Sequence, residues 1–442
     1  MEENLEKYMK SKKINLVAAD MGYGHQRAAY PLMNLSGNEI ITINNYPGIL
    51  EWEKKYWLNS LRSYEKFSRL KKIPLLGNLI FAVLDIFQKI QPLYPYRDLS
   101  RPTIQQKYFF QIIKRGLGKV LIEQLNSSGL PFVTTFFVAA HIAEYYNYQG
   151  DIYCIICDTD ASRAWAPLDP KNSRIKFLVP SDKVRERFLM YGVKEENIII
   201  TGFPLPLENI GDNKKIIKND LARRVKVLDP QGLYREHYQS LLKEIDKSPL
   251  NLSTVFSKKS SSKNLLTITY AVGGAGAQKE IGSLILHQLA LDIRNKKINL
   301  NLVAGNRAEV KDYFEQEILS LNLKIGEGVN IIYAPDKIEY FKKFNECLHA
   351  TDILWTKPSE LSFYCALGLP IIMSTPVGSQ EDFNRSWLLS AGAGVDSLDP
   401  SYTAQWLSDL LISGRLARAA MDGFLNAEQL GTYNIEKLII KK

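Results

Sequence analysis

The segment from Thr356 to Gly394 constrains the fold more than any other part of the chain. A hydrophobic run at residues 351–355 leads into a Lys-Pro turn and a short helix. A second apolar run at residues 370–373 leads into a Gly-Ser-Gln-Glu loop and a helix that ends in Gly-Ala-Gly. Two successive strand–turn–helix units build a parallel sheet, and α/β proteins bind nucleotides in the crevice at its carboxyl edge. The segment therefore predicts a nucleotide-binding α/β domain.

The same alternation of strand and helix patterns extends over two long stretches of the chain. Each stretch begins with a buried strand, a Gly-rich turn and a helix, at residues 14–30 and again from residue 265. The 442 residues suffice for two or three domains, each with its own core. We predict an α/β fold of two doubly wound Rossmann-like domains that face a central cleft. The predicted parts are a first domain at residues 1–205, a polar linker or insertion at 206–263 that ends in SKKSSSK, and a second domain at 264–442.

Positive charge is concentrated in one region of the first domain. Residues 50–119 contain 14 Lys and Arg against 5 Asp and Glu, a surplus equal to the net charge of +9 of the whole chain. The region also holds 12 aromatic residues, among them Trp52, Trp57, Phe81, Phe109 and Phe110. We interpret residues 48–126 as a basic helical insertion that contacts an anionic membrane surface. The alternatives are solvated lysines over an aromatic core face, or nucleic-acid binding, which no accompanying motif supports.

The chain carries no recognisable secretion signal or membrane-spanning segment. Residues 1–13 are charged, and the apolar run at 14–19 is too short for a signal peptide. The longest apolar stretch, residues 73–90, is interrupted by polar residues and falls short of the roughly 20 that a spanning helix needs. Cys154 and Cys157 form a lone CxxC inside a predicted strand, where they point to opposite faces, so we expect buried thiols and no metal site. These features predict a cytoplasmic protein with peripheral attachment to the inner face of the membrane.

Two turns of the first domain carry candidate catalytic groups. Gly22, Gly24 and His25 occupy the first strand-to-helix turn, where glycines admit a ligand and an imidazole can donate to a phosphate or accept a proton. Asp158 and Asp160 follow the end of another strand, where a carboxylate can take a proton from an acceptor hydroxyl. An ordinary capping role is the alternative for each turn, with the two acids paired to Arg163.

Candidate donor-binding residues occupy three turns of the second domain. The first turn has glycines whose backbone N–H groups can face a pyrophosphate, and it lacks the G-x-G-x-x-G spacing of dehydrogenases. A Lys-Pro-Ser-Glu turn follows the strand at 351–355, and polar side chains that can hold sugar hydroxyls begin the next helix. The predicted donor-binding set is Gly273, Gly274, Gly276, Lys357, Ser359, Glu360, Gln380, Glu381 and Asn384.

The order of these motifs resembles the GT-B glycosyltransferases. The similarity is to the group of monogalactosyldiacylglycerol synthases, processive diacylglycerol glucosyltransferases and peptidoglycan N-acetylglucosaminyltransferases. It covers residues 14–31, 151–206 and 265–394 and rests on GxGHxxAA, Asp-x-Asp before Trp165, the run at 177–205 and Gly-Gly-x-Gly-Ala. It implies an inverting, metal-independent transfer from a UDP-sugar to a lipid or membrane-associated acceptor, with no bound cofactor. Glu360 would then grip the ribose hydroxyls.

The chain departs from the group at two points. Arg163 lies where those families often carry a histidine before the tryptophan, and Glu360 comes earlier than their ribose-binding glutamate, whose position falls near Cys365. Two other functions therefore remain open. One is a nucleotide-sugar epimerase or hydrolase built on the same plan, and the other is a non-catalytic binding protein with this fold.

Overall fold

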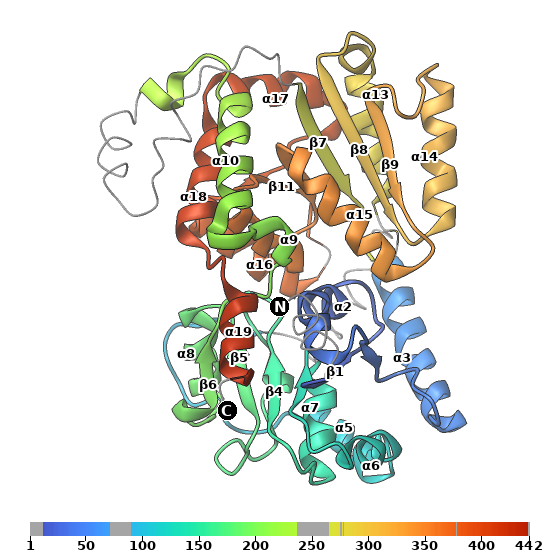
Figure 1. The fold of residues 1–442 in the computed structure, drawn as a ribbon, viewed down its shortest axis with the longest axis vertical. Helices are drawn as coiled ribbons and strands as arrows, with labels where there is room; N and C mark the ends of the chain where they lie inside the picture. Colours follow the sequence, from blue (N-terminus) through green and yellow to red (C-terminus); the bar gives the residue numbers. More distant parts are fainter. Residues whose placement is uncertain are drawn as a thin grey trace, which may run out of the picture. The chain divides into compact units, whose positions relative to one another are not determined.

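The computed structural model describes residues 12–70, 90–236 and 265–440, apart from residues 275, 277 and 377. The chain divides into two compact units (Figure 1), and each unit takes chain from more than one stretch. Unit 1 comprises Met1–Leu205, Val377–Asn384 and Leu430–Lys442, and unit 2 comprises Pro206–Pro376 and Arg385–Gln429. The first boundary agrees with the predicted end of the first domain. The second domain was predicted as one continuous stretch, and that prediction is wrong because two of its segments pack in unit 1.

Unit 1 contains a parallel sheet of six strands in the order β2-β1-β3-β4-β5-β6. The order reverses direction between β1 and β3, which makes this pair of strands the switch point of the sheet. At a switch point the two connecting helices leave to opposite faces and open a crevice at the carboxyl ends of the strands. The strands are β1 (Asn15–Ala18), β2 (Ile41–Thr42), β3 (Phe132–Thr134), β4 (Ile152–Ile155), β5 (Lys176–Val179) and β6 (Ile198–Ile200).

Both faces of this sheet are buried, because neighbouring residues on each strand point to opposite faces. Val17 and Phe132 pack into one hydrophobic core with the helices of the basic region, and Leu16 and Val133 pack into another core on the opposite face. The helical segments of the unit are α2 (Gly24–Ala29), η1 (Tyr30–Ser36), α3 (Glu51–Leu70), α5 (Ile104–Lys114), α6 (Lys119–Asn126), α7 (Phe137–Tyr145), η2 (Arg163–Trp165), α8 (Asp182–Met190), η3 (Glu195–Asn197) and α19 (Gly431–Ile440).

The last helix of the chain, α19, belongs to unit 1. Ile435 and Ile439 are buried in the same core as Leu16. The Thr432 hydroxyl donates to the carbonyl oxygen of Leu205 at 2.5 Å, and Asn434 donates to that of Thr201 at 2.9 Å. The C-terminal helix therefore completes the first domain rather than the second.

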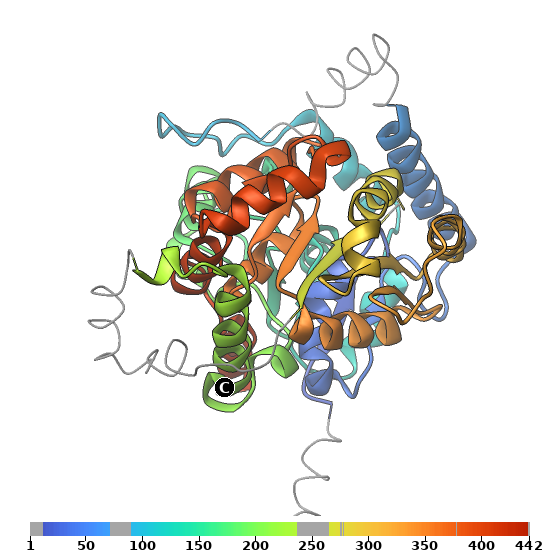
Figure 2. The ribbon, with the colours of Figure 1, turned by 90° about the horizontal axis from the view of Figure 1, so that it is seen from above.

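Unit 2 contains a second parallel six-stranded sheet, in the order β12-β11-β10-β7-β8-β9, with its switch point between β7 and β10. The strands are β7 (Leu266–Ala271), β8 (Ile298–Gly305), β9 (Val329–Tyr333), β10 (Ile353–Thr356), β11 (Ile371–Met373) and β12 (Gly394–Asp396). Strands β7 and β10 are buried along their whole length, as expected for parallel strands covered by helices on both faces (Figure 2). The helical segments are α9 (Leu207–Ile210), η4 (Asp212–Lys214), α10 (Lys215–Leu228), α13 (Lys279–Arg294), α14 (Ala308–Ser320), α15 (Lys337–Ala350), η5 (Glu360–Leu367), α16 (Ser379–Ser390), η6 (Pro400–Tyr402), α17 (Thr403–Ile412) and α18 (Arg415–Asn426).

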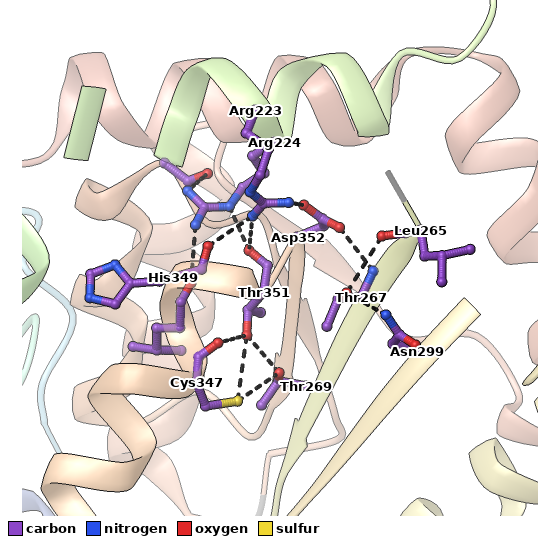
Figure 3. A network of polar contacts seen from close by, with 12 residues as sticks. Arg223, Arg224, Leu265, Thr267, Thr269, Asn299, Cys347, His349, Thr351 and Asp352 are labelled. Atoms are coloured by element: carbon purple, nitrogen blue, oxygen red, sulfur yellow. Dashed lines mark hydrogen bonds and ion pairs between the residues drawn. The ribbon is translucent and has the colours of Figure 1, made fainter. Parts of the chain in front are cut away.

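Helix α10 lies in the predicted linker, yet it is an integral part of unit 2. The buried Arg224 donates to the carbonyl oxygens of Thr351 and Leu367 at 2.8 Å (Figure 3). Arg223 donates to the Asp352 carboxylate at 2.5 Å, and that carboxylate also accepts from the backbone N–H of Thr267. Burial lowers the pKa of Arg224 to about 10. Of the two alternatives predicted for residues 206–263, a linker or an insertion, a free linker does not describe α10, because these contacts fix it to the amino-terminal ends of β7 and β10.

Within the basic helical insertion, the sequence also predicts single helices at residues 75–89 and 103–126. The second of these is divided into two helices, α5 and α6. Gly116 and Gly118 between them adopt φ values of +116° and +72°, which interrupt a right-handed helix. The predicted helix at 75–89 and the SKKSSSK segment lie outside the described residues.

Candidate functional site

The predicted site residues gather at the switch points of the two sheets. In unit 1, β1, β3 and β4 are neighbours, and their carboxyl ends lead to His25, Thr135 and Asp158. In unit 2, β11, β10, β7 and β8 are neighbours, and their carboxyl ends carry the Lys-Pro turn, the glycine loop and the turn before α14. These are the positions at which doubly wound sheets bind ligands.

His25 is held by a reciprocal pair of hydrogen bonds across the switch point of unit 1. Its Nδ1 atom lies 2.7 Å from the carbonyl oxygen of Thr135, and the Thr135 hydroxyl donates to the carbonyl oxygen of His25 at 2.8 Å. A carbonyl oxygen can only accept, so Nδ1 carries the proton of the neutral ring and Nε2 carries the lone pair. The side chain is partly exposed. This arrangement presents Nε2 as a proton acceptor.

The glycines of this turn allow the backbone to approach a ligand closely. Gly22 has a φ of +115°, a conformation that L side chains rarely adopt, and a Cβ atom placed there would meet no atom within 4 Å. Gly24 begins α2, which is only six residues long before it tightens into η1. A helix this short contributes only a small dipole at the turn.

Several aromatic rings lie beside His25. The ring centroid of His25 is 4.9 Å from that of Phe136 and 6.2 Å from that of Trp165. The centroids of Trp165 and Phe137 are 5.0 Å apart. Phe136 also contacts Trp57 of α3, at 6.2 Å. Phe136 therefore contacts both His25 and the first helix of the basic region.

Asp160 is a buried structural partner. Its two carboxylate oxygens accept from Nε and Nη2 of Arg187 at 2.8 and 2.9 Å, and both side chains are fully buried. One of the oxygens also accepts from the backbone N–H of Ala161. Lys183 lies 4.0 Å away. With both oxygens engaged away from solvent, Asp160 is poorly placed to receive a proton from a substrate.

Arg163 is bonded to backbone carbonyl oxygens and not to the two aspartates. Its guanidinium donates to the carbonyl oxygens of Ser100, Ala166 and Pro167 at 2.6 to 3.3 Å. Burial lowers its pKa to about 10. The alternative in which Arg163 pairs with the acids is therefore wrong. Arg163 instead closes the loop that carries Trp165. Arg163 is also the residue that stands where the resembling families often carry a histidine.

Asp158 is only partly buried, and its neighbour is Asn384. The Asn384 Nδ2 group donates to Asp158 at 3.1 Å, and Oδ1 accepts from the backbone N–H and the hydroxyl of Thr159 at 3.0 and 2.9 Å. All three residues belong to unit 1. Asn384 was predicted to bind the donor with residues of the second domain, but the structure places it on the Asp158 turn.

The Lys357 side chain packs closely against the glycine loop of unit 2. A Cβ atom on Gly273 would lie 3.0 Å from Cε of Lys357, so the lysine crosses the loop where only hydrogen leaves room. Gly276 has a φ of +68°. The loop leads into α13, whose 16 residues give its amino terminus a partial positive charge. Glycine backbone, helix terminus and lysine together form a turn suited to an anion.

Arg307 is a member of this turn that the sequence analysis missed. Its Nε donates to the carbonyl oxygen of Gly274 at 2.7 Å, which adds a second cation beside the glycine loop. Its place two residues after β8 is the signal that could have identified it, since β8 adjoins β7 in a sheet of the observed order. Arg187 was missed as well, because no local pattern links α8 to Asp160.

The remaining predicted donor residues lie at the starts of two helical segments. Ser359 and Glu360 begin η5, and both are partly exposed. Gln380 and the buried Glu381 lie in the first turn of α16, within the part of this helix that clusters with unit 1. The loop that leads to α16 is tied to the glycine loop, because Gln278 donates to the carbonyl oxygen of Thr375 at 3.0 Å.

The basic region divides into a buried and an exposed face. Trp57 and Phe110 are buried in the core, so part of its aromatic content is structural. Trp52 on α3 and Ile104 and Tyr108 on α5 are exposed, and Phe81 lies outside the described residues. Within the described ranges, no helix has the length and apolarity needed to cross a bilayer.

Comparison with known proteins identifies similar sequences and similar solved structures. No family model matches the chain. It is 18% identical over 398 residues to the processive diacylglycerol β-glucosyltransferase of Bacillus subtilis (strain 168), covering 87% of this chain and 83% of that protein. Similar solved structures are UDP-GlcNAc 2-epimerase from Neisseria meningitidis bound to UDP-GlcNAc (12% identity, TM-score 0.48, 97% and 100% coverage) and Acinetobacter baumannii MurG (11%, 0.48, 97% and 100%). The sequence similarity confirms the resemblance to the lipid-glycosylating group, and the structure confirms two parallel, Rossmann-like α/β sheets.

Proposed function

We propose that the protein is an inverting glycosyltransferase that moves a sugar from a UDP-sugar to a lipid acceptor. The observation that carries the proposal is the difference between the two switch points. One presents cations and glycine backbone, suited to a diphosphate, and the other presents a histidine whose Nδ1 faces a carbonyl oxygen, so that the neutral ring has its lone pair on Nε2. The similarity to a diacylglycerol glucosyltransferase over 87% of the chain supports the lipid acceptor.

In this proposal the donor binds at the carboxyl edge of the second sheet. The glycine loop, Lys357 and Arg307 hold the diphosphate, and Glu360 holds the ribose hydroxyls. Gln380 and Glu381 hold hydroxyls of the sugar. Lys357 and Arg307 would then stabilise the negative charge that develops on the diphosphate as UDP leaves, without a metal ion.

The tautomer of His25 determines how the transfer step proceeds in this proposal. Nε2 removes the proton of the acceptor hydroxyl as its oxygen attacks C1 of the sugar. The bond between C1 and the diphosphate oxygen breaks, and UDP leaves with the bonding electron pair. Attack on the face opposite the leaving group inverts the anomeric centre. The imidazolium then releases its proton to solvent.

The two aspartates take different roles in this proposal. Asp158 accepts a hydrogen bond from the acceptor and holds it between β1 and β4, whose ends lie on the order of 10 Å apart in a sheet with a strand spacing of about 4.8 Å. Asp160 fixes the turn through Arg187 and takes no proton. His25 is thus the general base, and the other two members of the predicted catalytic set serve binding and positioning.

The acceptor reaches the site from a membrane surface. We place contact with anionic lipid on the exposed side of α3 and α5, where Trp52, Ile104 and Tyr108 stand among lysines and arginines. In this proposal the protein is cytoplasmic and peripheral on the inner face of the membrane.

Two measurements test the function. The first is the shift in melting temperature with UDP, UDP-glucose and other nucleotide sugars, since a ligand at 100 times its dissociation constant adds about 2.7 kcal/mol to stability. The second is transfer of labelled glucose from UDP-glucose to diacylglycerol in anionic vesicles. UDP binding with a glycolipid product supports the proposal. Release of free sugar would favour a hydrolase, interconversion of nucleotide sugars an epimerase, and no response to any nucleotide a non-catalytic protein.

A further inference from the structure

We propose that Asn384 is a positioning residue of the acceptor side, which orients the Asp158 carboxylate instead of binding the sugar of the donor. The inference rests on the proposed function and assigns a side chain that the sequence places among the donor ligands. Three observations carry it, namely the hydrogen bonds of the amide, its burial and the division of α16 between the units.

The hydrogen bonds fix which end of the amide faces which partner. The Thr159 backbone N–H can only donate, so the atom opposite it is Oδ1. The Thr159 hydroxyl donates to the same oxygen, which fills both of its lone pairs. Nδ2 then faces Asp158 and can only donate, which matches an ionised carboxylate. An aspartate or a flipped amide would leave one of these contacts repulsive.

Burial argues against direct contact with a sugar. Asn384 is 1% exposed, and the Thr159 that it contacts is fully buried. Asp158 is more exposed than either. The buried amide of Asn384 therefore holds the more exposed carboxylate of Asp158, as expected of a residue that positions another.

The division of α16 explains why this contact can matter for turnover. The helix follows β11 and its loop, which the Gln278–Thr375 hydrogen bond ties to the glycine loop. Residues up to Asn384 cluster with unit 1, whereas the next residue, Arg385, forms an ion pair with Asp396 in unit 2. Through Asn384, the second turn of α16 sets the orientation of the carboxylate that receives the acceptor.

The experiment compares donor binding with acceptor kinetics in two variants of one helix. Asn384→Ala removes the amide, and Gln380→Ala removes a proposed sugar ligand one turn earlier. UDP-glucose affinity is measured by calorimetry, and kcat and KM are measured against diacylglycerol in vesicles. We expect Asn384→Ala to leave the donor Kd within twofold of wild type and to lower kcat/KM for the acceptor at least tenfold. Gln380→Ala should weaken donor binding.

A double substitution separates positioning from a general loss of activity. If Asn384 acts through Asp158, adding Asn384→Ala to Asp158→Asn should cost little more than Asp158→Asn alone. Asn384→Asp keeps the size but places a second carboxylate beside Asp158, so it should move the acid limb of the pH–rate profile to higher pH. A tenfold loss of donor affinity in Asn384→Ala with unchanged acceptor kinetics would overturn the inference.

The contact also has a test that does not depend on turnover. Asn384→Ala and Thr159→Val should be non-additive in the free energy of unfolding of the full chain, because they remove two sides of one hydrogen bond. If wild type transfers no sugar, the proposed function fails. Additive effects of these two substitutions would instead overturn the positioning contact itself.

Discussion

The Nδ1 atom of His25 donates to the carbonyl oxygen of Thr135 across 2.7 Å, and the Thr135 hydroxyl returns a hydrogen bond to the carbonyl oxygen of His25. The two residues follow adjacent strands, β1 and β3, on the two sides of the switch point. The pair therefore fixes both the orientation and the tautomer of the imidazole at the place where a parallel sheet opens a crevice.

Replacing His25 by Asn should separate the two functions of its ring. The amide nitrogen of Asn can imitate Nδ1 and keep the hydrogen bond to Thr135, while the acceptor at Nε2 is lost. We expect kcat for glycolipid synthesis to fall about 10²- to 10⁴-fold, the typical contribution of a general base. Donor affinity and melting temperature should stay near those of wild type. Full activity in this variant would exclude His25 as the base.

Gly273→Ala should weaken nucleotide binding by displacing Lys357. The added methyl group would lie 3.0 Å from Cε of the lysine, tighter than ordinary packing, so the lysine side chain must shift from its position at the loop. We expect the UDP affinity of Gly273→Ala to approach that of Lys357→Ala, and the double variant to lose little more. Titration calorimetry with UDP measures all three. Independent, additive losses would show that the lysine does not act at the glycine loop.

Arg307→Gln should reduce the affinity for UDP more than the affinity for uridine. The guanidinium is held against the Gly274 carbonyl oxygen, where its charge can act on a diphosphate but not on a base or ribose. The effect should shrink at high salt, since the interaction is between charges. Equal losses of affinity for UDP and uridine would show that Arg307 maintains the conformation of the loop and does not recognise the diphosphate.

Breaking the buried Asp160–Arg187 pair should destabilise the protein strongly. Removing one partner of a buried ion pair leaves an uncompensated charge, which costs about 3–5 kcal/mol. We expect Asp160→Asn to lower stability to chemical denaturation on that scale. Glu123→Ala, which removes the exposed Lys119–Glu123 pair, serves as the control and should cost less than about 1 kcal/mol. A stable but inactive Asp160→Asn protein would instead favour a catalytic role for Asp160.

Stability should depend on pH through His349 of unit 2. A hydrogen bond of 2.7 Å to Asp220 raises the pKa of His349 above its ordinary value of about 6.5. A raised pKa in the folded state gives a stabilisation that is complete below about pH 6.5 and is lost as the pH rises through the folded pKa. Melting temperatures measured upward from pH 5.5 should show this loss in wild type and a flatter profile in His349→Gln and Asp220→Asn. An unchanged profile in both variants would contradict the assignment.

The exposed apolar side chains of α5 should contribute to membrane binding. We expect the full chain to float with vesicles that contain anionic lipid, and Ile104→Ser with Tyr108→Ser to reduce the bound fraction. Added salt should reduce it too, because each Lys or Arg near an anionic surface contributes about 1 kcal/mol. Leu319→Ser, an exposed apolar residue of unit 2, is the matched control and should have no effect.

The periodicity of the chain was sufficient to predict both sheets and most of their turns. Buried strands such as Leu266–Ala271 are short runs rich in apolar and β-branched residues, and the glycine-containing turns that follow them have compositions suited to ligands. Helix α10 could not be placed from the sequence, although some helix was expected within residues 221–245, because a polar amphipathic helix and a polar linker have similar compositions. Arg224, buried in that helix, shows its true environment only through the carbonyl oxygens it meets.

The sequence by itself determined two parallel α/β sheets and the turns that carry His25, the glycine loop and Lys357, because strand and helix periods are properties of the local chain. Only the tertiary structure decided the membership of α19 and Asn384 in unit 1 and the partner of Asp160. Asn384 and Thr159 are 225 positions apart, and no local pattern encodes a contact over that distance. Such contacts are selected by packing and hydrogen-bond complementarity between folded elements, so the predicted donor ligand proved to be a neighbour of Asp158.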